Sequence, residues 1–162
     1  MSEIHSHLRA AIGYLELGMY VEALDELESI QPEERNSSAV LGLRLEIYRA
    51  AKNWKMMEVV ARELLKRQPD DPDDWNNLAF SIRRKDSVKA AQTLLLEALE
   101  KFPNDAMTRY NLGCYACQLG DMEEAKKLVG DAIRLDAKYK LLAIDDPDLE
   151  PLWQQIGSSK NF

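Results

Sequence analysis

The sequence predicts an all-α fold in which four helical hairpins stack into a solenoid, and three observations lead to this prediction. The residues that favour helices, Leu, Ala, Glu, Lys and Arg, dominate the 162-residue chain. Its 7 glycines and 6 prolines are too few for the many tight turns of an all-β fold. Similar segments also recur every 34 residues, and a fixed period of this size is typical of helical repeat proteins.

The 34-residue register is clearest in the second half of the chain. The segment "WNNLAFSIRR", which begins at Trp75, is matched 34 residues later by "RYNLGCYACQ", which begins at Arg109. Small and large apolar residues downstream of these segments recur in the same phase, as Ala91/Ala125, Leu95/Val129 and Ala98/Ala132. The register divides residues 1–139 into four repeats, at about 4–37, 38–71, 72–105 and 106–139, and leaves residues 140–162 as a C-terminal capping segment.

Each repeat contains two amphipathic helical patterns separated by a turn. Glycine at 18 and 120 suits the left-handed residue that ends many helices, and the prolines at 69 and 103 stop the second helices. The expected turns are Gly18-Met19, Lys52-Asn53, Asp86-Ser87 and Gly120-Asp121, and Pro72 is expected to begin a helix. One hairpin cannot bury its own apolar surface, so the hairpins are expected to stack.

The segment "KLLAIDDPDLEPLWQQI" follows the last repeat and carries apolar residues at helical spacing. A solenoid needs a terminal element that covers its last repeat. We expect the stretch from Leu149 to Ile156 to be that capping helix, with Trp153 as its main anchor. The alternative is that Trp153 belongs to a partner-binding motif.

The third repeat carries a family resemblance, through Trp75, Leu78, Ala79, Ile82, Ala91, Leu95, Ala98 and Pro103. These residues resemble the tetratricopeptide repeat (TPR) pattern W-x2-L-G-x2-Y, then A-x3-F, then P. The resemblance implies a right-handed α-α superhelix (solenoid), in which the first helix of each repeat lines a concave groove that holds a peptide or a partner helix. The segments "YNLGCYACQLG" and "AIDDPDLEPLW" also resemble the ending of small stand-alone bacterial TPR proteins of unassigned function.

A helical wheel places a mixed set of side chains on the expected groove face. Asparagines there can hydrogen-bond an extended backbone, and arginines favour carboxylates. The predicted partner-binding residues are Arg49, Asn76, Asn77, Phe80, Arg83, Arg84, Tyr110, Asn111 and Cys114. Further apolar residues on this face are Leu8, Ile12, Leu15 and Met107, and an exposed apolar stripe usually marks an interface.

This set predicts a groove for a mixed apolar and acidic peptide, or for an amphipathic helix. The alternative interpretation is that the apolar residues pack on neighbouring helices and that the arginines are solvated. The predicted function is a non-enzymatic protein–protein interaction module of the scaffold, adaptor or co-chaperone type, whose protein or peptide partner the sequence does not identify. A clamp for a chaperone's C-terminal carboxylate is not expected, because Leu8 and Ile12 stand where polar clamp residues would be needed. A homo-oligomeric structural protein is the alternative.

The only two cysteines, Cys114 and Cys117, have a C-x-x-C spacing. A redox C-x-x-C sits at the start of a helix after a strand, whereas these cysteines lie in the middle to latter half of an expected helix. A structural zinc site needs about four Cys or His ligands, and only His5 and His7 remain, about three repeats away. We therefore expect no catalytic residue, no metal and no cofactor, with a redox or metal protein as the weaker alternative.

Composition narrows the remaining classes. The net charge of −7 argues against a generic nucleic-acid binder, whose affinity comes from neutralising phosphates. No apolar run reaches the roughly 20 residues that span a bilayer, so no membrane association is expected. The first ten residues lack the pattern of a secretory signal, and 2 cysteines are too few for a disulfide framework, so the cytoplasm is the expected location.

Overall fold

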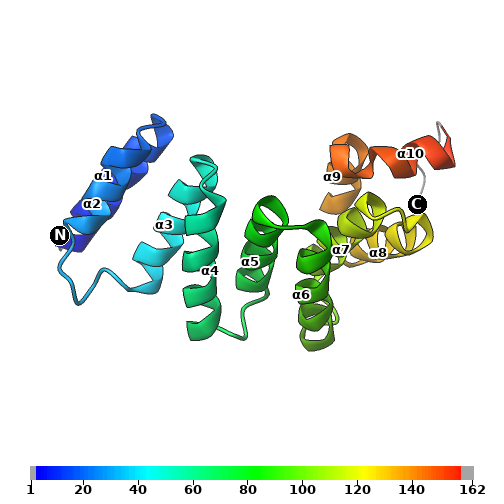
Figure 1. Ribbon diagram of the computed structural model, residues 1–162, viewed down its shortest axis with the longest axis horizontal. Coiled ribbons are helices and arrows are strands. Elements are labelled where there is room, and N and C mark those ends of the chain that lie inside the picture. Colours follow the sequence, from blue (N-terminus) through cyan, green and yellow to red (C-terminus); the bar gives the residue numbers. More distant parts are fainter. Residues whose placement is uncertain (1–2, 158–162) are drawn as a thin grey trace. The chain divides into compact units, whose positions relative to one another are not determined.

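The computed structural model describes residues 3–157, and within this range the regular secondary structure is entirely helical. The chain divides into two compact units, Met1–Pro69 and Asp70–Phe162. The first unit contains α1 (Glu3–Glu16), α2 (Tyr20–Glu28), α3 (Ser38–Ala50) and α4 (Trp54–Arg67) (Figure 1). The second contains α5 (Pro72–Lys85), α6 (Val88–Lys101), α7 (Ala106–Gln118), α8 (Met122–Leu135), α9 (Lys138–Asp145), the 3-10 helix η1 (Pro147–Leu149) and α10 (Glu150–Ile156). Residues 158–162, the end of the expected capping segment, lie outside the described range.

In the first unit, α1 pairs with α2, α3 pairs with α4, and α3 also contacts α1 and α2. Ala11 and Ala23 are completely buried, so the two helices of the first hairpin approach closely. Leu8 and Leu15 pack against the core that these residues share with Leu27, Ile30, Val40 and Ile47. The alternative interpretation is therefore right for Leu8 and Leu15, whereas Ile12 remains 45% exposed.

In the second unit, α5 pairs with α6 and α7 pairs with α8, and the first helices α5 and α7 are neighbours. The helices α7 and α8 approach each other closely at Gly113. A Cβ atom on this glycine would lie 2.6 Å from Cγ2 of Val129 and 3.1 Å from the Val129 backbone nitrogen. The absence of a side chain at Gly113 thus allows α7 and α8 to pack closely.

The expected turns are present at the ends of the first helices. Gly18 and Gly120 have φ values of 73° and 88°, the left-handed conformation that glycine adopts without strain. Lys52 stands in the equivalent turn of the second repeat and has a φ of 54° without being glycine. Pro72 begins α5, and the side chain of Asp71 accepts a hydrogen bond from the Asp73 backbone N–H at 3.0 Å.

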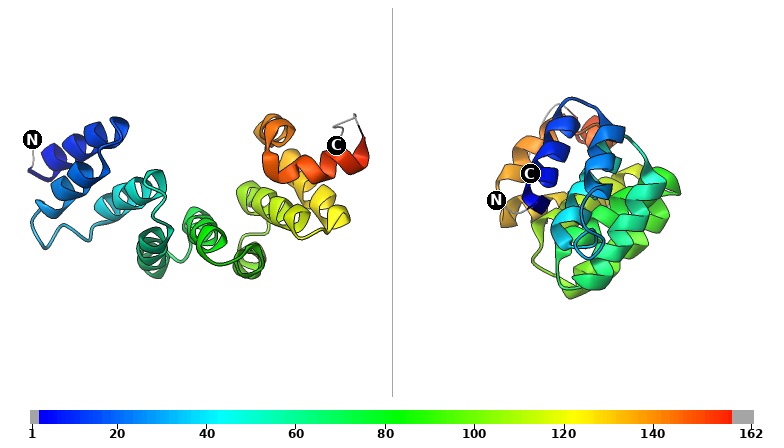
Figure 2. Two further views of the ribbon diagram at one scale, coloured as in Figure 1. Left: turned by 45° about the horizontal axis from the view of Figure 1, so that its top comes forward. Right: turned by 90° about the vertical axis from the view of Figure 1, so that its left-hand side faces the viewer.

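The C-terminal elements pack on the last hairpin. The helix α9 contacts α8, and α10 contacts both α7 and α8 (Figures 1 and 2). Trp153 is 3% exposed, and its indole Nε1–H donates a hydrogen bond to the Ala143 carbonyl oxygen at 2.9 Å. This buried position is the one expected of an anchor. Among residues 3–157, no helix has both the length and the apolar character that crossing a membrane requires.

Candidate functional site

The first helices of the second unit are held together by a network of amides. Asn76 is 4% exposed, and its Nδ2 donates to the Pro72 carbonyl and to Thr108 Oγ1, both at 2.9 Å. Asn111 Nδ2 in turn donates to Asn76 Oδ1 at 2.8 Å. Both asparagines were expected to hydrogen-bond a partner's backbone. Asn76 instead joins α5 to α7, and Asn111 uses at least one amide donor in the same joint.

The chain's own C-terminal segment lies on the predicted groove face of α5 and α7. Residues 146–149 connect α9 to α10, and we call them the DPDL segment after their sequence. Asp148 forms an ion pair with Arg83, in which both guanidinium–carboxylate distances are 2.5 Å. Tyr110 donates its hydroxyl proton to Asp146 Oδ2 at 2.7 Å, and Gln118 Nε2 donates to the Asp148 carbonyl oxygen at 2.8 Å.

The DPDL segment combines these polar contacts with one apolar contact and a fixed shape. Leu149 is 0% exposed. The Asp146 carboxylate also accepts a hydrogen bond from the Asp148 backbone N–H at 2.9 Å, and Pro147 follows directly as the first residue of η1. Asp146 and Pro147 therefore preorganise the turn that aims Asp148 at Arg83.

Arg83 and Tyr110 keep the protonation states that their hydrogen bonds to the DPDL segment require. Burial alone would lower the pKa of the Arg83 guanidinium, but its hydrogen bond to Asp148 and the charge of that carboxylate raise it. Burial makes the largest contribution to raising the pKa of the Tyr110 hydroxyl, and the hydrogen bond to Asp146 raises this pKa further. Tyr110 therefore remains a hydrogen-bond donor over the physiological pH range, and Arg83 remains a cation that is 15% exposed.

Other predicted residues lie on the same face beside this contact region. The guanidinium carbon of the exposed Arg84 lies 5.2 Å from the ring centroid of the half-buried Phe80, a cation–π arrangement. Asn77 is also half-buried on α5. At the other edge, a pocket is lined by Tyr110, Leu141, Leu142, Asp145, Asp146 and Pro147. Leu141 and Leu142 are 74% and 54% exposed, so this edge offers apolar surface to a partner.

Comparisons with known proteins agree with this arrangement of helices. A family model described as the tetratricopeptide repeat matches residues 94–127. The interferon-induced protein with tetratricopeptide repeats 2 of Mus musculus is 30% identical over 146 residues. The match covers 88% of this chain and 30% of that protein, so the chain spans less than a third of its relative's length.

Two solved structures are similar in fold. A thermophilic TPR protein of Thermus thermophilus superposes with a TM-score of 0.68 at 17% identity, covering 94% of this chain and 87% of that chain. YrrB, described as a TPR protein with an unusual peptide-binding site, superposes with a TM-score of 0.61 at 14% identity, covering 93% of this chain and 81% of that chain. This chain is a tetratricopeptide-repeat protein.

The fold class of this TPR protein is therefore the predicted superhelix of helical hairpins. TPR domains generally act as protein-binding scaffolds without catalytic activity. In its first unit, the predicted groove residue Arg49 lies half-buried on α3, and its guanidinium lies 3.5 Å from the Glu46 carboxylate. That pair spans i and i+3 on one helix and is solvated in part, so it contributes little to stability.

The cysteines of the TPR protein are free and buried. Burial makes the largest contribution to raising the pKa of the Cys114 thiol, and the negative charges of Asp146 and Asp148 raise it further. Burial also raises the pKa of the Cys117 thiol. Both thiols are therefore protonated near neutral pH and are poor nucleophiles. Cys114 Sγ lies 3.7 Å from Asp146 Oδ2, so it faces the DPDL segment and not an open groove. Within residues 3–157, no group of three or more His, Cys, Asp or Glu residues is arranged to hold a metal.

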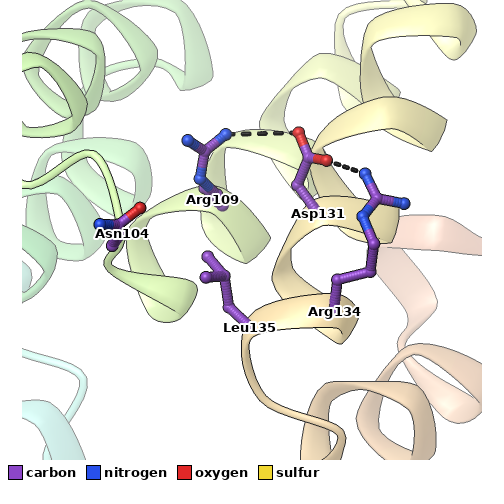
Figure 3. A pocket seen from close by; sticks show the side chains of 5 residues that line it. All are labelled: Asn104, Arg109, Asp131, Arg134 and Leu135. Atoms are coloured by element: carbon purple, nitrogen blue, oxygen red, sulfur yellow. Dashed lines mark hydrogen bonds and ion pairs between the residues drawn. The ribbon is translucent and has the colours of Figure 1, made fainter.

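A second pocket of the TPR protein lies between α7 and α8, and its charged groups already pair with one another (Figure 3). Arg109 donates to the Pro103 carbonyl from two nitrogens, at 3.0 and 2.6 Å, and pairs with Asp131 at 3.3 Å. Asp131 also forms an ion pair with Arg134. These contacts fix the loop before α7 and account for the arginines without a ligand.

Sequence reasoning placed Arg83, Tyr110 and Cys114 on a shared face but did not find what lies against them. Asp146 and Asp148 were assigned no role beyond their place in the expected capping segment, residues 140–162. Two acids that flank a proline, in a chain whose groove face carries arginines, are the signal that could have suggested this contact.

Proposed function

We propose that this TPR protein is a non-enzymatic interaction module that holds a segment of a partner protein on the face formed by α5 and α7. One observation carries the proposal: this face already holds a short acidic segment, through Arg83, Tyr110 and Gln118. An arginine that pairs with a carboxylate through both of its oxygens, and an amide that binds a backbone carbonyl, are contacts typical of peptide recognition.

The part of the face beside the DPDL segment supports the same proposal. Phe80 and Arg84 offer an aromatic ring and an exposed cation, and aromatic and arginine side chains dominate the binding energy of many interfaces. The description of YrrB as a TPR protein with a peptide-binding site adds support from a protein of similar fold. The partner we propose is a protein whose segment carries both acidic and apolar residues.

The test is chemical crosslinking in source cells, with the crosslinked positions mapped by mass spectrometry. Asn76, Asn111 and Arg83 are left unchanged in this test, because each already bonds to another group of the chain. We instead choose Phe80→Ser/Arg84→Glu. The control is Leu96→Ser/Lys126→Glu, which likewise replaces one apolar residue by serine and one cation by glutamate, at exposed positions on the second helices α6 and α8.

The proposal predicts that partner crosslinks to wild type fall on α5 and α7. It also predicts that they decrease at least tenfold in the Phe80→Ser/Arg84→Glu variant and persist in the control. Crosslinks that fall on α6 and α8, or that survive unchanged in the first variant, would contradict it.

A further inference from the structure

We propose that the DPDL segment is an internal ligand, and that a partner binds the α5/α7 face by displacing it with an acidic segment of the same order. This inference rests on the proposed function and specifies the partner's chemistry. The displacing segment carries acids at positions i and i+2 and a large apolar residue at i+3, as Asp146, Asp148 and Leu149 do here.

The DPDL segment lies where a cap is not needed. A cap for a solenoid needs only to cover the apolar surface of its last helix. The contacts of α9 and α10 with α8 meet that need. The DPDL segment, however, reaches across α7 to Arg83 on α5, which is 65 residues away in sequence. It therefore occupies a face that capping does not require it to cover.

The polar groups of the DPDL segment are matched by partners on α5 and α7. Each DPDL group meets a matched group on the helices: Asp146 meets the Tyr110 hydroxyl, Asp148 meets Arg83, and the Asp148 carbonyl meets Gln118. The carbonyl contact does not depend on the side chain of the ligand. The other two select carboxylates at a spacing of two residues. The exposed Arg84 on the same helix adds a second positive charge to this face. Although the net charge of the chain is −7, the face itself therefore favours an acidic ligand.

The ion pair that holds the DPDL segment is accessible to solvent. The side chains of Arg83 and Asp148 are 15% and 24% exposed, so water reaches the ion pair. The Trp153 indole N–H donates to the Ala143 carbonyl oxygen on α9, a hydrogen bond within the C-terminal part itself. A tethered ligand of this kind competes at an effective concentration of roughly millimolar order. The apparent affinity for a partner then falls by the fraction of molecules in which the face is open.

The test uses a fluorescent synthetic peptide that covers residues 143–154, titrated into full-length protein by anisotropy. The segment variant Asp146→Asn/Asp148→Asn/Leu149→Ser removes the three DPDL anchors. The control variant Leu96→Ser/Glu97→Gln/Glu100→Gln makes comparable changes, one leucine to serine and two carboxylates to amides, at exposed positions on α6. A third protein combines the segment variant with Arg83→Gln. Circular dichroism verifies that each variant keeps its helices.

The inference predicts that the peptide binds the segment variant at least tenfold more tightly than wild type or the control. It also predicts that Arg83→Gln abolishes this gain. Equal affinity for wild type and the segment variant, or a gain that survives Arg83→Gln, overturns the inference. If the segment variant loses helix content, Asp148→Asn alone replaces it, with an expected gain of at least threefold, and no gain then overturns the inference.

The outcomes separate this inference from the proposed function, because the two tests change different residues. Partner crosslinks that depend on Phe80 and Arg84, together with no peptide gain, leave the proposed function standing and remove the internal ligand. Loss of both results removes both proposals.

Discussion

Arg83 on α5 and Asp148 in η1 form an ion pair with two guanidinium–carboxylate contacts of 2.5 Å. This pair joins the third repeat to the C-terminal segment. Both side chains are less than one quarter exposed, so their charges are partly removed from water and interact more strongly than a surface pair does. It is the strongest polar link between the DPDL segment and the face that we propose binds a partner.

A double-mutant cycle with Arg83→Gln and Asp148→Asn should give a coupling energy of about 1.5–3 kcal/mol, the range for hydrogen bonds to charged groups. The measurement is the free energy of unfolding in urea for wild type, both single variants and the double variant. The Lys127–Glu124 pair is the matched comparison, because it is an exposed i, i+3 pair at 3.5 Å. Its coupling should lie below about 0.5 kcal/mol. Similar coupling in the two pairs would contradict the importance given to Arg83.

Asp74 makes the stability of the protein depend on pH. The pKa of this carboxyl is raised to about 6, mainly by burial and further by the negative charges of Asp71 and Asp73. Its Oδ2 atom is buried and has no hydrogen-bond partner among the described residues. In the unfolded chain the carboxyl titrates near a pKa of about 3.9, so the folded state holds its proton to higher pH. The contribution of Asp74 to stability is therefore full below about pH 4 and is lost as the pH rises through about 6.

Asp74→Asn should accordingly raise the free energy of unfolding at pH 7 by about 1–2 kcal/mol, since one pKa unit corresponds to about 1.4 kcal/mol. The gain should disappear at pH 4. Thermal and urea unfolding at both pH values check this. Asp145→Asn at an exposed position is the control and should change stability by less than about 0.5 kcal/mol. A gain for Asp74→Asn that is the same at pH 4 and pH 7 would refute the assignment.

Gly113 should not tolerate a methyl group. Its Cβ would lie 2.6 Å from the Val129 side chain, and overpacking of this kind costs about 1–3 kcal/mol, more than the helix propensity gained. A Cβ on Gly13, inside α1, would have no atom of another helix within 4 Å. Gly113→Ala should therefore destabilise the protein, and Gly13→Ala should stabilise it by about 0.5–1 kcal/mol. Urea unfolding of the two variants decides, and effects of the same sign would show that the α7/α8 approach is looser than described.

The two thiols should be unreactive in the folded protein. Because burial raises the pKa of both Cys114 and Cys117, their alkylation at pH 8 should be at least about tenfold slower than that of glutathione. In urea the two rates should become similar. Alkylation is followed by mass spectrometry. Rapid reaction of native Cys114 would revive the redox interpretation of the C-x-x-C spacing.

The repeat register predicted much of the fold because small residues, turn glycines and prolines act locally. Gly18, Pro72 and Gly120 stand at turns or helix starts for reasons that the neighbouring residues reveal. Lys52 shows that the register also predicts a turn where the favourable residue is missing.

The candidate site was predictable only in part, because a helical wheel gives the direction of a side chain but not its neighbours. The wheel placed Tyr110 and Cys114 together on one face of α7, and in the structure both are buried against Asp146. It also could not reveal that Asn76 lies between two helices and bonds to Thr108. Such contacts depend on tertiary packing between segments that are tens of residues apart.

Amide hydrogen exchange of the wild-type protein tests the central claim most directly, because it detects the occupied face without any substitution. The account predicts that an excess of the 143–154 peptide increases exchange at residues 146–149 severalfold, while α7 and α8 remain protected. A control peptide with asparagine in place of both Asp146 and Asp148 should have no such effect. Unchanged exchange at residues 146–149 in millimolar peptide would contradict the account.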